Sequence, residues 1–193
     1  MRLFIVRHGQ TAWNIAGKAQ GHTDIPLDPT GQAQAAAVAR AFEGVRLDRV
    51  ISSDLLRAKE TAEAFGLPVE TRVDLRERSF GEWEGRDYVT MMNDLEARAE
   101  AAGVTRLLVR PPGGESFQDV WNRIGPFVEE LKRVQDNTLV VCHGAMKAIL
   151  LARLMDGNLE TCRAFRFKNC AVTEFERRHE GTLVMVRYAE QYQ

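Results

Sequence analysis

The sequence contains few cysteines, and neither sign of charge is in excess. Its three cysteines, Cys142, Cys162 and Cys170, are odd in number and lack metal-site spacing, so neither a disulfide framework nor a zinc motif is expected. The 26 Lys and Arg residues nearly balance 27 Asp and Glu residues, which gives a formal net charge of -1. Such a chain has no overall field to attract polyanions, so we predict no nucleic-acid partner and no membrane partner.

Long apolar runs are also absent. No stretch approaches the roughly 20 apolar residues that a membrane-spanning helix needs. Met1-Arg2 leads directly into the apolar segment Leu3–Val6, without the pattern of a secretory signal. From these features and the cysteine content we expect a soluble protein of the reducing cytoplasm.

Several common catalytic motifs are missing as well. The chain contains no GxxxxGK[ST], GxGxxG, GxSxG or HExxH pattern. These absences argue against nucleotide hydrolysis by a P-loop and against serine hydrolysis.

Short apolar segments alternate with segments of helical character. With 45% apolar residues, the 193-residue chain can fill one core, so we predict a single domain over residues 1–193. The predicted strands are Arg2–Arg7, Arg49–Ser52, Pro68–Thr71, Thr138–Cys142, Ala171–Glu176 and Thr182–Arg187. The predicted helices are Pro29–Phe42, Leu55–Phe65, Asp87–Ala102, Ser116–Val134 and Ala145–Met155. This alternation predicts an α/β fold, a three-layer α/β/α sandwich whose sheet is mainly parallel with one antiparallel strand near the C-terminus.

Two histidines each follow a predicted strand and precede a glycine, in Arg7-His8-Gly9 and in His143-Gly144. The crevice of a parallel sheet lies at the carboxyl ends of its strands, so we expect both rings in one catalytic centre. Neutral imidazole is a good nucleophile toward phosphorus, and Arg7 can hold phosphate oxygens through paired hydrogen bonds. The pattern predicts phosphoryl transfer with His8 as nucleophile and His143 as a donor to phosphate, while Gly9 lets the backbone approach the anion.

Further candidates lie in a predicted helix and a predicted loop. Arg57 falls near the start of a helix, where free amides already favour anions, and it could hold the phosphate together with Arg7. Glu77, Glu82 and Glu84 compete for the role of proton donor to the leaving alcohol, and their spacing does not choose among them.

Other residues carry weaker signals. Arg86, Arg106 and Arg110 are candidates for contact with a second anionic group, although each is more often solvent-facing. Pro111–Ser116 is predicted to be a turn and a helix start. His22 is predicted to be a loop residue.

The stretch Val6–Asn14 (VRHGQTAWN) resembles the histidine phosphatase superfamily, in its phosphoglycerate mutase-like branch. The resemblance continues in collinear blocks at Gln20–Leu27, Ser52–Ala62, Leu75–Gly85 and Val141–Gly144, which span most of the chain. It implies an α/β/α fold and a chemistry that needs neither a metal ion nor a cofactor.

The resemblance also implies residue roles. His8 is the covalent nucleophile and Glu77 the proton donor, while Arg7, Arg57 and His143 hold the phosphoryl group. The implied substrate contacts are Arg7, Asn14, Gln20, Gly21, Arg57, Glu77 and Gly144.

Two departures from the mutases favour hydrolysis. Gln10 and Thr11 replace the Glu-Ser that often follows Arg-His-Gly in cofactor-dependent mutases, and the stretch between Gly85 and Pro111 lacks the basic insertion of the longer mutases. Pro111–Ser116 also resembles short phosphatases such as the alpha-ribazole phosphatases. We predict a metal-independent phosphatase of small-molecule phosphate monoesters that forms phosphohistidine at His8. The alternative is phosphoglycerate mutase-type transfer between hydroxyls of a phosphoglycerate.

The sequence is also compatible with two other classes of protein, a metal-dependent hydrolase and a non-catalytic binding module. A metal-dependent hydrolase would use His8, His143 and carboxylates as ligands, but the guanidinium of Arg7 would repel the cation. A non-catalytic module could instead sense phosphorylated ligands. The sequence allows a homodimer without identifying an interface.

Overall fold

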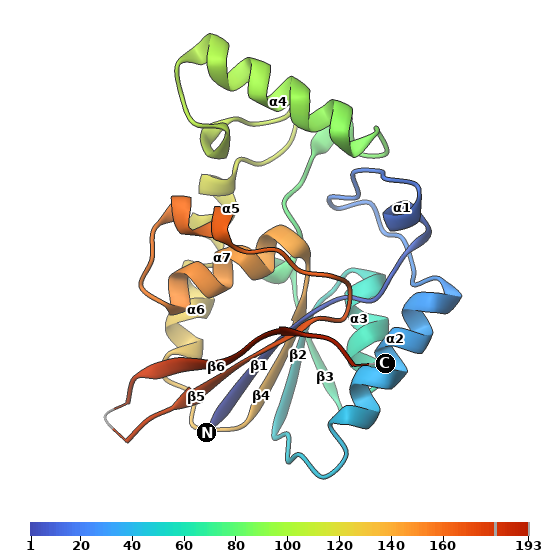
Figure 1. Cartoon of the computed structure of the whole chain (residues 1–193), viewed down its shortest axis with the longest axis vertical. Helices are drawn as coiled ribbons and strands as arrows, with labels where there is room; N and C mark the ends of the chain where they lie inside the picture. The colour runs from blue at the N-terminus through green and yellow to red at the C-terminus, as the bar shows by residue number, and fades with distance from the viewer. Residues whose placement is uncertain (180, 193) are drawn as a thin grey trace.

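A six-stranded sheet forms the centre of the computed structural model, which describes residues 1–179 and 181–192 (Figure 1). Its strands are β1 (Arg2–Arg7), β2 (Arg49–Ser53), β3 (Val69–Arg72), β4 (Thr138–Cys142), β5 (Val172–Arg177) and β6 (Leu183–Glu190). They lie in the order β3-β2-β4-β1-β5-β6. The strands β1 to β4 are parallel, whereas β5 runs antiparallel between β1 and β6. The predicted α/β fold with its mainly parallel sheet is confirmed.

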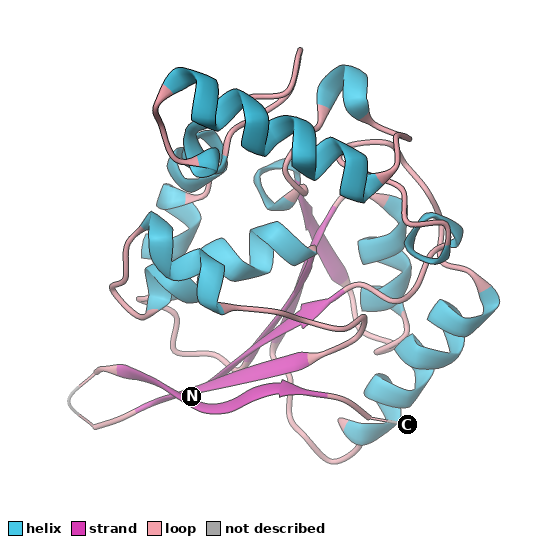
Figure 2. Ribbon diagram, turned by 45° about the horizontal axis from the view of Figure 1, so that its top comes forward, coloured by secondary structure: helices cyan, strands magenta, loops and turns pink. Residues whose placement is uncertain are grey.

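Helices cover both faces of this sheet (Figure 2). They are α1 (Ala12–Ile15), α2 (Pro29–Ala41), α3 (Leu56–Glu63), α4 (Tyr88–Ala102), α5 (Phe117–Arg123), α6 (Gly125–Leu131) and α7 (Gly144–Leu154). Short 3-10 helices are η1 (Val73–Leu75), η2 (Gly81–Trp83), η3 (Arg106–Leu108) and η4 (Leu159–Ala164). The predictions for α2, α3, α4 and α7 are confirmed within two residues at each end.

The predicted helix over Ser116–Val134 was wrong in its continuity, since two helices replace it. Helix α5 ends at Arg123, and α6 starts at Gly125 with Ile124 between them. Pro126 stands at the second position of α6. Because proline lacks an N–H and its ring clashes with the preceding turn, it suits the start of a new helix and not the middle of a long one.

Alternate residues of the strands fill two separate apolar cores. In β1, Leu3 and Ile5 pack in the core that includes α5, α6 and α7, whereas Phe4 and Val6 pack in the core that includes α2 and α3. Successive side chains of a strand point to opposite faces, so a continuous apolar run can serve both cores.

A third, smaller core lies beyond the sheet under α4, which Figure 1 shows apart from the other helices. It contains Phe80, Trp83, Met91 and Leu95. The helix α1, which sequence reasoning missed, begins at a capping box formed by Thr11 and Asn14. These segments cover the end of the sheet where β1, β2 and β4 finish. Within the described residues, no helix is long and apolar enough to cross a bilayer.

Candidate active site

The two histidines predicted to meet lie side by side at the carboxyl ends of β1 and β4. The parallel register pairs Arg7 with Cys142, so the next residues of each strand are His8 and His143. Their ring centroids are 5.2 Å apart, and both side chains are buried. The His8 amide also donates to the Cys142 carbonyl at 2.9 Å. Strand pairing therefore brings together residues 135 positions apart in the chain.

The His8 ring is held in one tautomer by its neighbour. Its Nδ1 lies 2.7 Å from the carbonyl oxygen of Gly9. A carbonyl oxygen only accepts hydrogen bonds, so Nδ1 carries the proton and Nε2 keeps its lone pair. The ring thus presents an unprotonated nitrogen, which is the form a nucleophilic histidine requires.

Burial and neighbouring cations keep both rings neutral. Desolvation, followed by the charges of Arg57 and Arg7, holds the pKa of His8 well below its usual value. The pKa of His143 is lowered in the same way, by burial and then mainly by Arg57. Burial removes solvation from an added positive charge and the two guanidinium groups repel it, so the uncharged ring is favoured.

We expect neither His8 nor His143 to titrate between pH 8 and about pH 5.5, where an unperturbed imidazole with a pKa of about 6.5 becomes mostly charged. A lowered pKa means that protonation starts only at a more acidic pH, so both rings stay neutral over this window. Long-range ¹H–¹⁵N NMR spectra of the ring nitrogens, assigned with His8→Gln and His143→Gln variants, measure this directly. Titration of either ring near pH 6.5 would contradict the assignment of neutral imidazoles.

Two arginines, the buried Arg57 and the partly buried Arg7, lie near the rings, and each has a nitrogen with no partner among the described residues. Arg57 donates from Nη1 to the Thr23 carbonyl at 2.9 Å and from Nη2 to the Gly21 carbonyl at 2.8 Å, but its Nε is unpartnered. Arg7 donates from Nη1 to the Phe167 carbonyl at 2.5 Å, and its Nε is also unpartnered. Burial lowers the pKa of Arg57 to about 10, so it remains cationic at neutral pH.

Unpartnered donors continue around the same place. Both ring nitrogens of His143 are buried without a hydrogen-bond partner among the described residues. In the neutral ring of His143 one nitrogen donates and the other accepts, so the Nε atoms of Arg7 and Arg57 and one nitrogen of His143 are donors suited to an anionic ligand. A phosphoryl group, with its several acceptor oxygens, fits this arrangement.

We call the place bounded by the side chains of Arg7, His8, Arg57 and His143 the cup. Glu77 is the carboxylate that lies beside it. Its Oε2 accepts from the amide of Ala145 at 3.1 Å, and its Oε1 accepts from the amides of Met146 at 3.2 Å and Arg78 at 2.9 Å. The amides of Ala145 and Met146 belong to the first turn of α7, where they have no partner within the helix, so Glu77 satisfies them. The carboxylate therefore occupies the same helix terminus that follows His143.

The two competing carboxylates occupy other places. Glu84 accepts hydrogen bonds from the amides of His22, Thr23 and Phe80 and from the Thr23 hydroxyl, which ties several loops together. Glu82 is exposed. Position separates the three carboxylates, since Glu77 alone among them lines the cavity described next.

A cavity of about 620 Å³ opens over His8. The sequence-predicted residues on its wall are Arg7, His8, Asn14, Gln20, Gly21, Arg57, Glu77 and Gly144. Gln20 is buried there with an unpartnered Oε1, whereas the Oδ1 of Asn14 accepts from Thr11 and from Asn169. His143 is fully buried beside the His8 ring.

The role predicted for Gly9 was wrong. A side chain on Gly9 would place its Cβ 2.6 Å from the Gly31 carbonyl oxygen, so the missing side chain allows β1 and α2 to pack closely. The amide of Gly9 donates to Thr61 Oγ1 at 3.0 Å instead of reaching into the cavity. Gly9 serves the site through its carbonyl, which fixes the tautomer of His8.

Sequence reasoning missed much of the outer cavity wall. Its aromatic surface comes from Trp13, Phe80, Tyr88, Phe117, Phe165 and Phe167, and its further cations, apart from Arg106, are Lys18, Arg78, Arg163 and Arg166. The one available signal was the alternation of Arg and Phe over residues 163–167, just before the last pair of strands. Of the three arginines considered for a second anionic group, Arg106 lines the cavity, while Arg86 pairs with Asp94 and Arg110 with Asp119.

A buried lysine supports this wall from behind. Lys147 donates from Nζ to the Ala171 carbonyl at 2.7 Å and lies 4.5 Å from the centre of the Phe167 ring. Burial lowers its pKa to about 7. Together with Arg7, which holds the Phe167 carbonyl, it fixes the chain segment that carries the aromatic wall.

Comparison with known proteins agrees with this geometry. The family model described as "Histidine phosphatase superfamily (branch 1)" matches residues 3–190. The adenosylcobalamin/alpha-ribazole phosphatase of Escherichia coli is 35% identical over 172 residues, covering 86% of this chain and 85% of that protein. A Proteus mirabilis protein named "probable phosphoglycerate mutase GpmB" is 31% identical over 182 residues, covering 91% of this chain and 85% of that protein.

A solved structure shares the whole architecture. The alpha-ribazole phosphatase from Shigella flexneri superimposes with a TM-score of 0.86 at 29% identity, covering 98% of this chain and 96% of that chain. The protein described here belongs to the histidine phosphatase superfamily, as its sequence motifs predicted.

Proposed function

We propose that this protein is a phosphatase that hydrolyses small-molecule phosphate monoesters through a phosphohistidine on Nε2 of His8. The observation that carries the proposal is the contact of His8 Nδ1 with the Gly9 carbonyl, which leaves Nε2 unprotonated. Around this ring lie unpartnered donors, namely the Nε atoms of Arg7 and Arg57 and the ring of His143. Fixed donors aimed at developing negative charge are the largest catalytic contribution in many enzymes.

In the first step, the Nε2 lone pair of His8 attacks phosphorus, and the bond between phosphorus and the ester oxygen breaks. The electron pair of that bond stays on the leaving oxygen. Glu77 in its protonated form gives this oxygen a proton, so the product leaves as an alcohol. Arg7, Arg57 and His143 stabilise the equatorial phosphoryl oxygens throughout.

In the second step, water attacks the phosphohistidine. Glu77, now a carboxylate, takes a proton from the water as its oxygen bonds to phosphorus. The bond between phosphorus and Nε2 breaks, and its electron pair returns to His8. Inorganic phosphate leaves, and both residues regain their starting protonation states.

Hydrolysis is favoured over a mutase reaction. The first-named relative and the superimposed structure are both phosphatases by name, although another relative has a mutase name. A mutase must return the phosphoryl group to a second hydroxyl before water reaches it. Isomerisation of 3-phosphoglycerate without release of inorganic phosphate would favour the mutase alternative.

Metal independence and a cytoplasmic location are further parts of the proposal. Arg7 and Arg57 give the cup a positive charge that disfavours a divalent cation at His8. The three cysteines are free and buried, and burial raises the pKa of each thiol to about 12, which suits a reducing compartment.

A panel of phosphate monoesters tests the proposal. We expect release of inorganic phosphate at an unchanged rate after exhaustive chelation, and an acid-labile, alkali-stable phosphoprotein in rapid-quench samples. Loss of activity that a divalent ion restores would indicate a metal-dependent hydrolase instead. Phosphate binding without turnover of any ester would indicate a non-catalytic sensor.

A further inference from the structure

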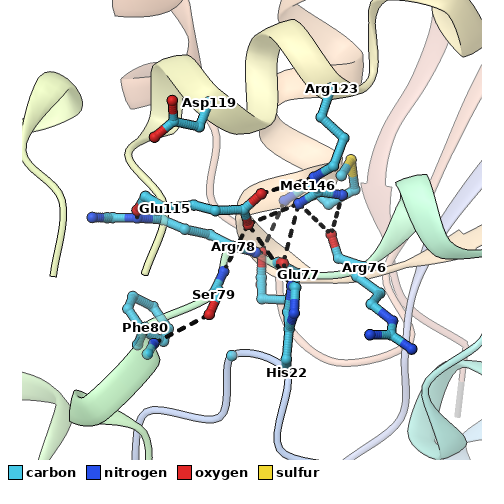
Figure 3. Close-up of polar contacts among 12 residues, drawn as sticks. His22, Arg76, Glu77, Arg78, Ser79, Phe80, Glu115, Asp119, Arg123 and Met146 are labelled. Atoms are coloured by element: carbon cyan, nitrogen blue, oxygen red, sulfur yellow. Dashed lines mark hydrogen bonds and ion pairs between the residues drawn. The ribbon is translucent and has the colours of Figure 1, made fainter. Parts of the chain in front are cut away.

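The loop Pro111–Ser116, predicted only to be a turn and a helix start, packs against the segment that carries Glu77. We call the residues Asp74–Ser79 the Glu77 loop. In Figure 3, the side chains of Glu115 and of Arg123, the last residue of α5, reach toward this loop. Neither side chain lines the cavity, so the chemistry proposed above gives them no part.

Arg123 holds the main chain on one side of Glu77. Its Nη1 donates to the Asp74 carbonyl at 2.7 Å and to the Arg76 carbonyl at 3.2 Å. Its Nη2 donates to the Arg76 and Glu77 carbonyls, both at 3.3 Å. One guanidinium therefore binds three carbonyl groups of the Glu77 loop, those of Asp74, Arg76 and Glu77, an arrangement that needs the planar fork of arginine.

Glu115 connects this guanidinium to the other side of Glu77. Its two carboxylate oxygens accept from Nε and Nη2 of Arg123, both at 3.0 Å, and Oε2 also accepts from the Ser79 amide at 3.0 Å. The main chain of Glu115 adds two bonds, because its amide donates to the Ser79 carbonyl and its carbonyl accepts from Arg78 Nε. The Glu77 loop is thus fastened both before and after its catalytic carboxylate.

Two further features make this fastening rigid. A Cβ on Gly114 would lie 2.8 Å from the Ser79 carbonyl oxygen, and one on Gly81 would lie 2.2 Å from the Pro112 carbonyl oxygen, so the two loops touch backbone to backbone. His22 Nε2 lies 2.8 Å from the Glu77 carbonyl oxygen and donates to it. The network leaves the Glu77 peptide little freedom.

We propose that Arg123, held by Glu115, is a positioning residue that places the carboxyl group of Glu77 against the leaving-group oxygen. The proposal rests on the phosphatase function given above. A general acid is effective only within hydrogen-bond reach of the proton's destination. Displacement of about 1 Å can reduce a rate by roughly a hundredfold, even when the substitution lies away from the reacting atoms.

The test compares two substrates that depend differently on Glu77. An alkyl phosphate expels a strongly basic alkoxide unless it is protonated, whereas 4-nitrophenyl phosphate expels an anion that is stable near neutral pH. The value of kcat/KM covers events up to phosphorylation of His8, so it isolates the step in which Glu77 acts as acid. A residue that positions Glu77 affects the first substrate and spares the second.

We expect Arg123→Met to lower kcat/KM for an alkyl phosphate by roughly 10- to 100-fold, and for 4-nitrophenyl phosphate by less than about threefold. Arg123→Lys keeps the charge but not the fork, so its loss should be intermediate. Glu115→Gln weakens the grip on Arg123 and should show the same selectivity. Activity toward 4-nitrophenyl phosphate reports that each variant is folded and can be phosphorylated.

Arg110→Met is the matched control. Arg110 pairs with Asp119 through two hydrogen bonds of 2.6 Å and lies at the start of the same loop. It makes no hydrogen bond to the Glu77 loop within the described part of the chain. We expect this variant to hydrolyse both substrates within about twofold of wild type, as surface ion pairs contribute little.

Glu77→Gln separates failure of this inference from failure of the proposed function. Glu77→Gln should itself show the leaving-group selectivity, and adding Arg123→Met to it should cause no further selective loss. If Glu77→Gln is selective while Arg123→Met, Arg123→Lys and Glu115→Gln reduce both substrates equally, the positioning role is wrong. If Glu77→Gln shows no selectivity, the assignment of Glu77 as acid fails first, and the positioning role fails with it.

Discussion

Substitution of His8 by alanine is expected to lower kcat by roughly 10⁴-fold or more while leaving a folded protein, because it removes the nitrogen that bonds to phosphorus. His8 is buried, and its ring contacts His143 at a centroid distance of 5.2 Å. Removal of the ring leaves a small space but breaks no bond of the sheet, so we expect the variant to unfold in one cooperative transition. The measurements are steady-state release of phosphate, circular dichroism and the yield of acid-labile phosphoprotein.

The control for this substitution is His179→Ala. His179 is exposed in the connection between β5 and β6, so its loss should leave turnover unchanged. The His8→Ala variant should still bind orthovanadate or inorganic phosphate, since Arg7, Arg57 and His143 remain. Turnover by well-folded His8→Ala protein within a hundredfold of wild type would refute the phosphohistidine mechanism.

Substitution of Arg57 by methionine is expected to lower kcat/KM by roughly 10²- to 10³-fold, which is typical for loss of one fixed donor to transition-state charge. Arg57 is completely buried, and its unpartnered Nε belongs to the cup around His8. Its side chain also holds the carbonyl groups of Gly21 and Thr23, so the variant should lose some thermal stability. Binding of orthovanadate should weaken in parallel with kcat/KM.

Arg49→Met controls for the general effect of replacing an arginine by methionine in this protein. Arg49 lies at the opposite end of β2 and pairs with Glu70 and Glu130 on the surface. It should change kcat/KM by no more than about twofold. Retention of activity within tenfold of wild type by folded Arg57→Met protein would show that Arg57 serves the fold and not the phosphoryl group.

The two predictions differ in how visible their residues are in the sequence. His8 follows a strand with the apolar run Leu3–Val6 and precedes glycine, a local pattern that indicates a strand end in the crevice. Arg57 has no such pattern, because one arginine in a helix usually faces solvent. Only the fold shows that the second residue of α3 is buried against the loop that contains Gly21.

Spacing alone did not choose among the three carboxylates, and although the family resemblance implied Glu77, the physical reason for the choice needed the tertiary structure. Glu77, Glu82 and Glu84 lie within eight residues of one another, in a segment with little regular structure. Their surroundings differ because distant segments reach them: the start of α7 contacts Glu77, and the loop around His22 contacts Glu84. The same argument applies to Arg123, whose partners lie up to 49 residues away in the chain.

The sequence by itself determined the strands, most helices and the meeting of the two histidines. These features follow from apolar runs, caps and glycines within a few residues, together with the general rule that parallel strands share a carboxyl edge. Only the tertiary structure decided what surrounds each carboxylate, why Gly9 must lack a side chain, and which arginines are buried. Those properties depend on contacts between segments far apart in the chain, and such contacts leave no fixed spacing to detect.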